Sequence, residues 1–202
     1  EGIPYRMAGF HSDITDSKLT EDALISQTAL QTILMDISSK YININFNEID
    51  SSINESLRQL ASFVGADRSY VFDYDFKRNI CNNSFEWCAE GIDPQIDQLQ
   101  NVPTEAIHWW VETHIKGDSL YIDDVDALDD KDPVKDILQP QGIKSIITIP
   151  LMESENCVGF VGFDFVKSYR AYSDNEEILL RVFAEMLVNV KHRADLERKL
   201  IE

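Results

Sequence analysis

The sequence predicts an α+β fold, and three observations support this class. Residues 17–40 and 174–200 place apolar side chains at the three- and four-residue steps of a helix, so we expect a long helix near each end. Between them, short runs rich in β-branched and aromatic residues alternate with turn residues, which is typical of strands joined by hairpins. Two of these runs, 143–152 and 157–166, are apolar almost throughout, which indicates strands covered on both faces.

Size, charge and cysteine content narrow the class of protein. The chain has 202 residues, 44% of them hydrophobic, which is enough for one domain with a sizeable core. A net charge of −18 argues against contact with nucleic acid or anionic membranes. Three cysteines without a C-x-x-C spacing favour a reducing compartment, so the expected location is the cytoplasm. A first residue other than Met predicts a piece of a longer protein.

The amino-terminal third is predicted to be helical. Residues 1–16 read as a strand remnant that ends in a turn, and Thr15 or Asp16 can cap the helix that follows. That helix carries a stripe with the alternating steps of a coiled-coil seam, formed by Leu19, Ala23, Ser26, Leu30, Ile33 and Ile37. A second helix is expected over residues 47–64, and Gly65 fits its end.

The first two strands are predicted to form a hairpin over residues 68–75 and 80–90. Alternation places Tyr70 and Phe72 on one face of the first strand, and Phe85 and Trp87 on one face of the second, without showing which face is which. The odd spacing of Cys81 and Cys88 predicts that the two thiols point to opposite faces.

The remainder of the chain alternates short elements and ends in a long helix. We expect a loop over 91–103, a helix over 104–116 and a strand over 119–125. An acidic loop over 126–140 follows, with a turn of helix at 134–138 as an alternative within it, and a hairpin at 153–156 joins the two apolar strands. One stripe of the last helix suits packing on a sheet: Phe183, Leu187, Val190 and Ala194. A second stripe has heptad spacing: Leu179, Val182, Met186, Asn189, Arg193, Leu196 and Leu200. Asn189 in that seam favours a parallel dimer, the alternative being that Asn189 and Arg193 are simply solvated.

Several phrases resemble the GAF domains of bacterial sensor kinases and cyclic-di-GMP enzymes. They are GADRSYVF at 65–72, FEWCAEGIDPQIDQLQNVP at 85–103, HWW at 108–110, QGIKSIITIPL at 141–151 and GFVGFDFV at 159–166. The order of the predicted elements is also that of a GAF domain. The resemblance, over about residues 25–195, implies an antiparallel sheet of five to six strands, with the terminal helices on one face and a small-molecule pocket on the other.

The stretch GFHSDITDSKLTEDAL at 9–24 resembles the exit of a PAS sensor domain, where a last strand feeds a signalling helix. This resemblance divides the chain into a PAS remnant at 1–16, a connector helix at 17–40, a GAF core at 41–175 and a carboxy-terminal helix at 176–202 that continues as a coiled-coil linker. A stiff helix that enters and another that leaves can carry a rotation between neighbouring domains.

No residue is assigned a catalytic role. The sequence has no Gly-rich phosphate loop, no nucleophile elbow, no H-E-x-x-H and no kinase or cyclase signature. His108 and His114 are six residues apart, which places them on different helix faces, so ordinary imidazoles are favoured over a haem ligand. The acidic stretch 123–132 lacks the Gly and terminal Glu of a calcium loop, so no metal and no cofactor are expected.

The cysteines of this sequence differ from those of two kinds of GAF domain whose chemistry depends on a cysteine. The three cysteines do not follow the pattern of GAF proteins that reduce free methionine sulfoxide, and the helix AIHWWVETHIKG lacks the cysteine that anchors a bilin in other relatives. Structural thiols are the favoured interpretation.

The candidate ligand pocket draws on one set of residues: Tyr70, Phe72, Glu86, Trp87, Trp109, Trp110 and Asp164. Each aromatic residue has an ordinary core position as its alternative. Asp164 is the most informative member, because a carboxylate inside the run GFVGFDFV requires a ligand donor or an Arg or Lys partner.

Three hypotheses follow. The first is a non-catalytic sensory module that dimerises through its terminal helices and relays a signal, with or without a small-molecule ligand, between a PAS domain and a histidine-kinase or cyclic-di-GMP output domain. The dimer seam would use Leu19, Leu30, Ile33, Ile37, Leu179, Val182, Met186, Asn189, Leu196 and Leu200. The second is a dimerisation spacer without a ligand, and the third is an enzyme related to the sulfoxide reductases.

Overall fold

The computed structural model describes residues 15–201, so most of the stretch assigned to a PAS remnant lies outside the described residues. The helices are α1 (Thr15–Ile42), α2 (Ile49–Val64), α3 (His108–Ile115), α4 (Pro133–Leu138) and α5 (Asp174–Ile201). The strands are β1 (Arg68–Asp75), β2 (Ile80–Cys88), β3 (Val102–Pro103), β4 (Leu120–Ile122), β5 (Ser145–Glu153) and β6 (Asn156–Phe165). Short 3₁₀ turns are η1 (Phe46–Glu48), η2 (Thr104–Ile107), η3 (Val125–Ala127) and η4 (Gln139–Gln141). Among residues 15–201, no helix combines the length and apolar character needed to cross a bilayer.

The strands form one six-stranded antiparallel sheet in the order β3-β2-β1-β6-β5-β4. The predicted α+β class is therefore confirmed. Two hairpins, β1–β2 and β5–β6, meet at the centre, where β1 pairs with β6 although the two strands are far apart in the sequence. This pairing places Arg68 directly opposite Asp164.

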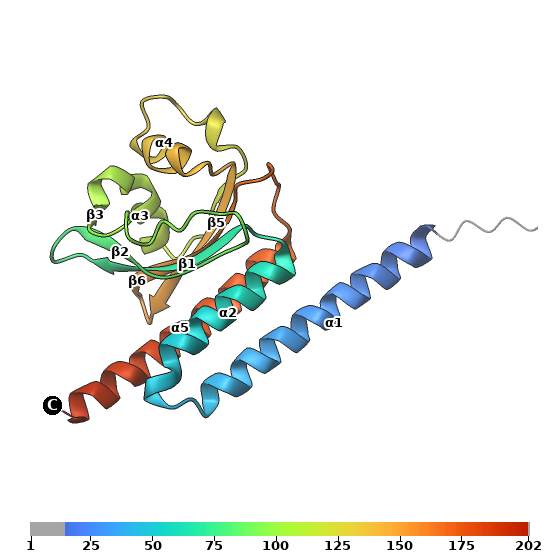
Figure 1. Ribbon diagram of the computed structural model, residues 1–202, viewed down its shortest axis with the longest axis horizontal. Helices are drawn as coiled ribbons and strands as arrows, with labels where there is room; N and C mark the ends of the chain where they lie inside the picture. The colour runs from blue at the N-terminus through green and yellow to red at the C-terminus, as the bar shows by residue number, and fades with distance from the viewer. Residues whose placement is uncertain (1–14, 202) are drawn as a thin grey trace, which may run out of the picture.

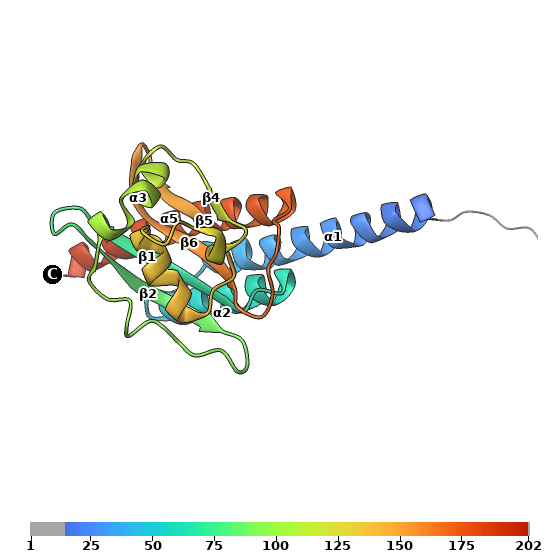
Figure 2. The ribbon, with the colours of Figure 1, turned by 90° about the horizontal axis from the view of Figure 1, so that it is seen from above.

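One face of the sheet is covered by α2 and α5, and α1 packs on these two helices on the side away from the sheet (Figure 1). The layer is apolar because each strand sends alternate side chains into it, among them Val71, Val161 and Phe163, all 0% exposed. The predicted sheet-facing stripe of α5 is buried here, since Phe183, Leu187, Val190 and Ala194 belong to the same core. The amino-terminal part of α1 runs on past the rest of the domain (Figure 2).

Part of the predicted dimer seam is used inside the chain instead. Leu30, Ile37 and Leu179 are 8%, 0% and 0% exposed and belong to the core between the helices and the sheet, so they are not available to a second copy. The heptad spacing is satisfied by packing of α1 on α2 and α5. Ile33 and Met186 are half-buried against the same core and Val182 is half-buried, whereas Asn189 and Leu196 are exposed. The side chains of Leu19 and Leu200 lie outside the described residues.

A β-bulge in β2 changes which residues share a face. Val71 pairs with Phe85 but the next residue, Phe72, pairs with Asn83, so Ser84 is the extra residue. The extra residue reverses the alternation, and Cys81 and Cys88 both face the side opposite α2 and α5. The prediction that these two thiols point to opposite faces was wrong for this reason.

Candidate ligand pocket

A cavity lies between the second face of the sheet and the segments that carry α3 and α4. The space open to the centre of a water-sized sphere is about 50 Å³. Most of its wall is apolar, with aromatic rings from β1, α3 and β6 and aliphatic side chains from α4 and β5. Its polar wall consists of Arg68, Tyr70, Glu86, Gln141 and Asp164.

An ion pair between the two central strands forms the polar wall. The Nη1 atom of Arg68 donates to Asp164 Oδ2 at 3.0 Å and to Gln141 Oε1 at 3.1 Å, and both charged side chains are 2% exposed or less. Asp164 Oδ1 accepts a hydrogen bond from the Tyr70 hydroxyl at 2.7 Å. The partner that the sequence demanded for Asp164 is therefore Arg68, supplied by the strand next to it.

The close approach of Tyr70 to Asp164 depends on Gly162. A Cβ atom at Gly162 would lie 2.7 Å from the Tyr70 ring and 2.7 Å from Thr148 Cγ2, which is closer than real side chains allow. Glycine in the middle of β6 leaves the space across which Tyr70 reaches Asp164.

Glu86 ties the loop after β2 to this wall. Its Oε2 atom accepts the backbone N–H groups of Gln95 at 2.8 Å and Ile96 at 3.0 Å. Its Oε1 atom lies 3.8 Å from Arg68 Nε and 3.3 Å from the donating Asn83 Nδ2. The bulge at Ser84 makes this possible, because it turns Glu86 to the same face as Tyr70.

The polar wall has one negative charge in excess. Burial raises the pKa of Asp164 to about 6, with Arg68 and the Tyr70 hydrogen bond opposing the shift. Burial also lowers the pKa of Arg68, but the carboxylates of Asp164 and Glu86 more than offset this effect, so the guanidinium stays charged. At neutral pH, two carboxylates face one guanidinium.

The apolar wall is built from stacked and tilted rings. Phe72 and Phe160 stack with their centroids 4.7 Å apart, and Trp110 lies 5.6 Å from Phe160. Beneath them His114 is 0% exposed, hydrogen-bonded to the Tyr74 hydroxyl at 2.9 Å and to Thr148 Oγ1 at 3.0 Å. Burial lowers the pKa of His114 to about 3, so the imidazole is neutral and structural.

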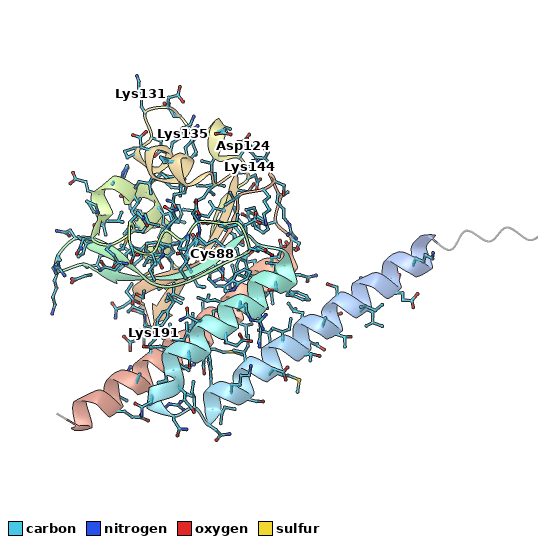
Figure 3. All side chains as sticks on the ribbon, in the orientation of Figure 1. Cys88, Asp124, Lys131, Lys135, Lys144 and Lys191 are labelled. Atoms are coloured by element: carbon cyan, nitrogen blue, oxygen red, sulfur yellow. The ribbon has the colours of Figure 1, made fainter. Side chains whose placement is uncertain are left out.

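The acidic loop 123–132 holds α4 in place over the cavity. Asp132 caps α4 by accepting from the backbone N–H of Val134 at 2.9 Å. Lys135 turns back into the loop, where its ammonium donates to the carbonyl oxygens of Asp126 and Leu128 and to the Asp130 carboxylate (Figure 3). A lysine thus takes the central position that a cation would hold. In the part of the chain that the structure describes, no group of three His, Cys, Asp or Glu side chains could hold a metal ion.

The cavity brings together five of the seven residues that the sequence singled out: Tyr70, Phe72, Glu86, Trp110 and Asp164. Trp87 does not line it, because Trp87 shares the face of Phe85 and packs against the core under α2 and α5. Trp109 also points elsewhere, since its indole nitrogen donates to the Asp132 carboxylate at 3.1 Å. Sequence reasoning missed Arg68, Gln141, Cys81 and the α4 residues Val134, Ile137 and Leu138. An arginine at the start of the strand RSYVFDYD was the one signal that could have identified Arg68.

Solved structures share this architecture. The phycoerythrobilin-bound GAF domain of a cyanobacterial phytochrome is 17% identical, with a TM-score of 0.70 and coverage of 84% of this chain and 97% of that one. The blue-light-absorbing GAF domain of Thermosynechococcus elongatus PixJ is 17% identical, with a TM-score of 0.61 and coverage of 84% and 94%. The chromophore-binding domain of the Stigmatella aurantiaca bacteriophytochrome is 14% identical, with a TM-score of 0.62 and coverage of 81% and 60%. These likenesses show the fold.

A sequence relative extends over nearly the whole chain. The methanogenesis regulatory histidine kinase FilI of Methanothrix harundinacea is 29% identical over a match 206 residues long. The match covers 95% of this chain and 22% of that protein. This chain therefore spans about a fifth of the length of that relative. The family model of the GAF domain matches residues 48–190, from the turn before α2 to α5, and so includes the whole sheet and the cavity. The chain belongs to the GAF domain family.

Proposed function

We propose that this chain is a non-catalytic sensory module, which binds a small molecule in the cavity and passes the resulting change to its terminal helices. The observation that carries the proposal is the buried Arg68–Asp164–Glu86 cluster at one end of an otherwise apolar cavity. Buried charges contribute little net stability compared with apolar packing, so a binding role explains their presence better than a structural one.

Four hydrogen bonds offer a route from the cavity to the helices. Strand β1 presents Arg68, Tyr70 and Phe72 to the cavity, and the next residue, Asp73, accepts a hydrogen bond from Lys191 of α5. Arg193 of α5 donates to the carbonyl oxygens of Tyr41 at 3.0 Å, Ile42 at 3.1 Å and Ile44 at 3.2 Å, where α1 ends. The incoming and outgoing helices are thus in direct contact.

The three thiols, two buried and that of Cys88 half-buried, argue against the enzyme hypothesis. Thiol-dependent reduction of a sulfoxide requires an accessible thiolate. Burial raises the pKa of Cys81, which lines the cavity, to about 12, and that of Cys88 and Cys157 to about 11. All three are therefore protonated thiols at neutral pH.

The proposed output is a histidine kinase, supported by the relative from Methanothrix harundinacea. The proposed PAS domain before α1 rests on the resemblance of residues 9–24 alone. We also propose that two copies pair through the exposed apolar residues that the fold leaves uncovered. Leu24 and Ile25 are 63% and 60% exposed on the projecting part of α1, and Leu196 is 49% exposed on α5. These replace Leu30, Ile37 and Leu179 as the contact residues.

Light scattering at increasing concentration tests the pairing. We expect a dimer for the wild type and a monomer for the double variant Leu24→Glu, Ile25→Glu. Phe76→Glu is the matched control, because Phe76 is an equally apolar, 44% exposed residue outside the helices, in the turn after β1. A wild-type chain that stays monomeric at high concentration overturns the pairing and leaves ligand binding to be judged on its own.

A further inference from the structure

The geometry points to a ligand class for the cavity: a small uncharged molecule with an apolar body and a carbonyl-type hydrogen-bond acceptor. The inference rests on the proposed function, since it specifies what the same cavity binds. It is carried by the unpaired polar atoms in the wall, by the charge of the polar wall and by the size of the cavity.

Two residues that line the cavity each carry a buried nitrogen donor without a hydrogen-bond partner. Trp110 Nε1 and Arg68 Nε are buried and have no hydrogen-bond partner among residues 15–201. The neighbouring Trp109, by contrast, donates its indole N–H to Asp132. Because buried donors in native proteins are nearly always paired, a molecule that supplies acceptors completes this wall. Asn83 Oδ1 and the Tyr172 hydroxyl are also unpaired, but neither residue lines the cavity.

Charge excludes ionised ligands of either sign. An anion would add to the one negative charge that Glu86 and Asp164 already have in excess over Arg68. A cation such as an amidinium brings donors but no acceptor, so it would leave Trp110 Nε1 and Arg68 Nε unsatisfied and would compete with the donors that already bond every carboxylate oxygen of Glu86 and Asp164. A neutral acceptor satisfies the two donors without changing the charge balance.

The remaining wall and the volume limit the body of the ligand. The rest of the lining is apolar and includes Phe72, Phe160, Leu138 and Ile146 beside the Trp110 ring, which favours an apolar group. A cavity of about 150 Å³ binds benzene, so 50 Å³ admits only a molecule well below the size of a six-membered ring without movement of side chains. Acetamide has this size, and a flat ring such as benzamide enters when the side chains of α4 yield.

Two sets of isosteric probes test the inference. Acetamide, acetate and acetamidinium share one shape and differ in charge and in the acceptors and donors that they present, as do benzamide, benzoate and benzamidinium. The readout is the indole N–H resonance of Trp110 in proton–nitrogen correlation spectra, identified by its loss in Trp110→Phe. The chain has three tryptophans, so Trp87 and Trp109 provide internal controls in the same spectrum.

We expect the two amides to move the Trp110 resonance downfield, as a new hydrogen bond does, and to bind about tenfold more tightly than their charged analogues. Trp110→Phe replaces the indole with a smaller ring that has no donor, so amide affinity, followed here by backbone amide resonances of the cavity residues, falls about tenfold. Glu86→Gln removes one negative charge at constant shape, and the preference for the amide over the carboxylate falls.

The outcomes separate the ligand class from the proposed function. If a carboxylate or an amidinium binds the wild-type chain more tightly than its amide, the ligand class is overturned and the sensory function stands. If none of the six probes moves the Trp110 resonance at millimolar concentration, both the ligand class and ligand binding at this cavity are overturned, and the ligand-free spacer becomes the better description.

Discussion

The two faces of the sheet are made from the same strands but differ in what they bury. In β6, Val161 and Phe163 point to the helices, and Phe160, Gly162 and Asp164 point to the cavity. The helix side is filled with apolar side chains from α1, α2 and α5. The cavity side contains Arg68, Glu86, His114 and Asp164 and retains a hollow. We therefore expect the helix side to contribute most of the folding stability. The cavity side is less closely packed, as the proposed ligand site requires.

The difference in packing predicts the largest effect, and one substitution on each face measures it. Phe163→Ala removes a 0% exposed ring from the helix face, so we expect a loss of about 3–5 kcal/mol in the free energy of unfolding. Phe72→Ala removes a ring that borders the cavity and costs less, because the new space joins an existing hollow. Urea unfolding of the two variants measures both values. Equal losses in the free energy of unfolding would mean that the two faces contribute equally to stability.

The buried carboxylate of the cavity face predicts a pH dependence that the helix face lacks. Burial raises the pKa of Asp164 from an ordinary 3.8 to about 6. The folded state therefore holds the proton more tightly than the unfolded chain, and stability falls as pH rises from about 4 to 6. Against Asp164→Asn, which does not titrate, the wild type should lose about 3 kcal/mol over this interval. Unfolding at a series of pH values gives the difference, and a flat difference would show that Arg68 keeps the carboxylate ionised throughout.

A smaller effect is expected at Gly162, on the cavity face of β6, where Tyr70 and Thr148 leave no room for a side chain. Gly162→Ala brings a methyl group against the Tyr70 ring and Thr148, and overpacking of this kind costs about 1–3 kcal/mol. Val161→Ala, one residue away on the helix face, is the matched control, because it leaves a space where Gly162→Ala fills one. Urea unfolding should give a loss for both. The Tyr70→Phe background tests the cause: if it leaves the cost of Gly162→Ala unchanged, the Tyr70 hydroxyl, also 2.7 Å from the added Cβ, is not what the methyl group displaces.

The same comparison shows how far the sequence alone could reach. Short-range periodicity specified the helices, the two hairpins and the apolar strands, because each is encoded within about ten residues. Asp164 could be recognised as a cavity residue for a similar reason, as a charge within an apolar run. The bulge at Ser84 could not, since one extra residue leaves no trace in the alternation of β2 but turns Glu86 and Cys81 to the cavity.

Contacts between distant segments were the other limit. The heptad spacing of α1 predicts a partner, and the partner proved to be helices of the same chain, which is why Leu30 and Ile37 are buried here. The carboxylate of Asp132 holds the indole of Trp109, a contact across 23 positions that no local pattern indicates. Arg68 and Asp164 lie 96 positions apart and meet only because β1 pairs with β6.

The smallest predicted effect tests whether the two faces communicate. Asp73 lies on β1 beside the cavity residue Phe72, and its carboxylate accepts hydrogen bonds from Lys191 of α5 and from Ser84 at the bulge. Both charged side chains are partly exposed, so a double-mutant cycle with Asp73→Asn and Lys191→Met should give a coupling of about 0.5–1 kcal/mol in stability. A pair this weak is a poor stabiliser but a suitable connection, because a ligand that moves β1 can shift it at little cost.

The connection becomes visible when the cavity is titrated. In the wild type, benzamide should move the backbone amide resonances of α5 around residue 191 together with the Trp110 indole. In Lys191→Met, we expect the affinity for benzamide and the Trp110 shift to stay the same while the α5 shifts shrink. His192→Ala is the matched control, because the neighbouring His192 bonds Glu153 of the β5–β6 hairpin instead of β1. If the α5 resonances shift equally in both variants, the Asp73–Lys191 pair does not transmit the ligand-induced change. The change then reaches α5 through the apolar core between the sheet and the helices.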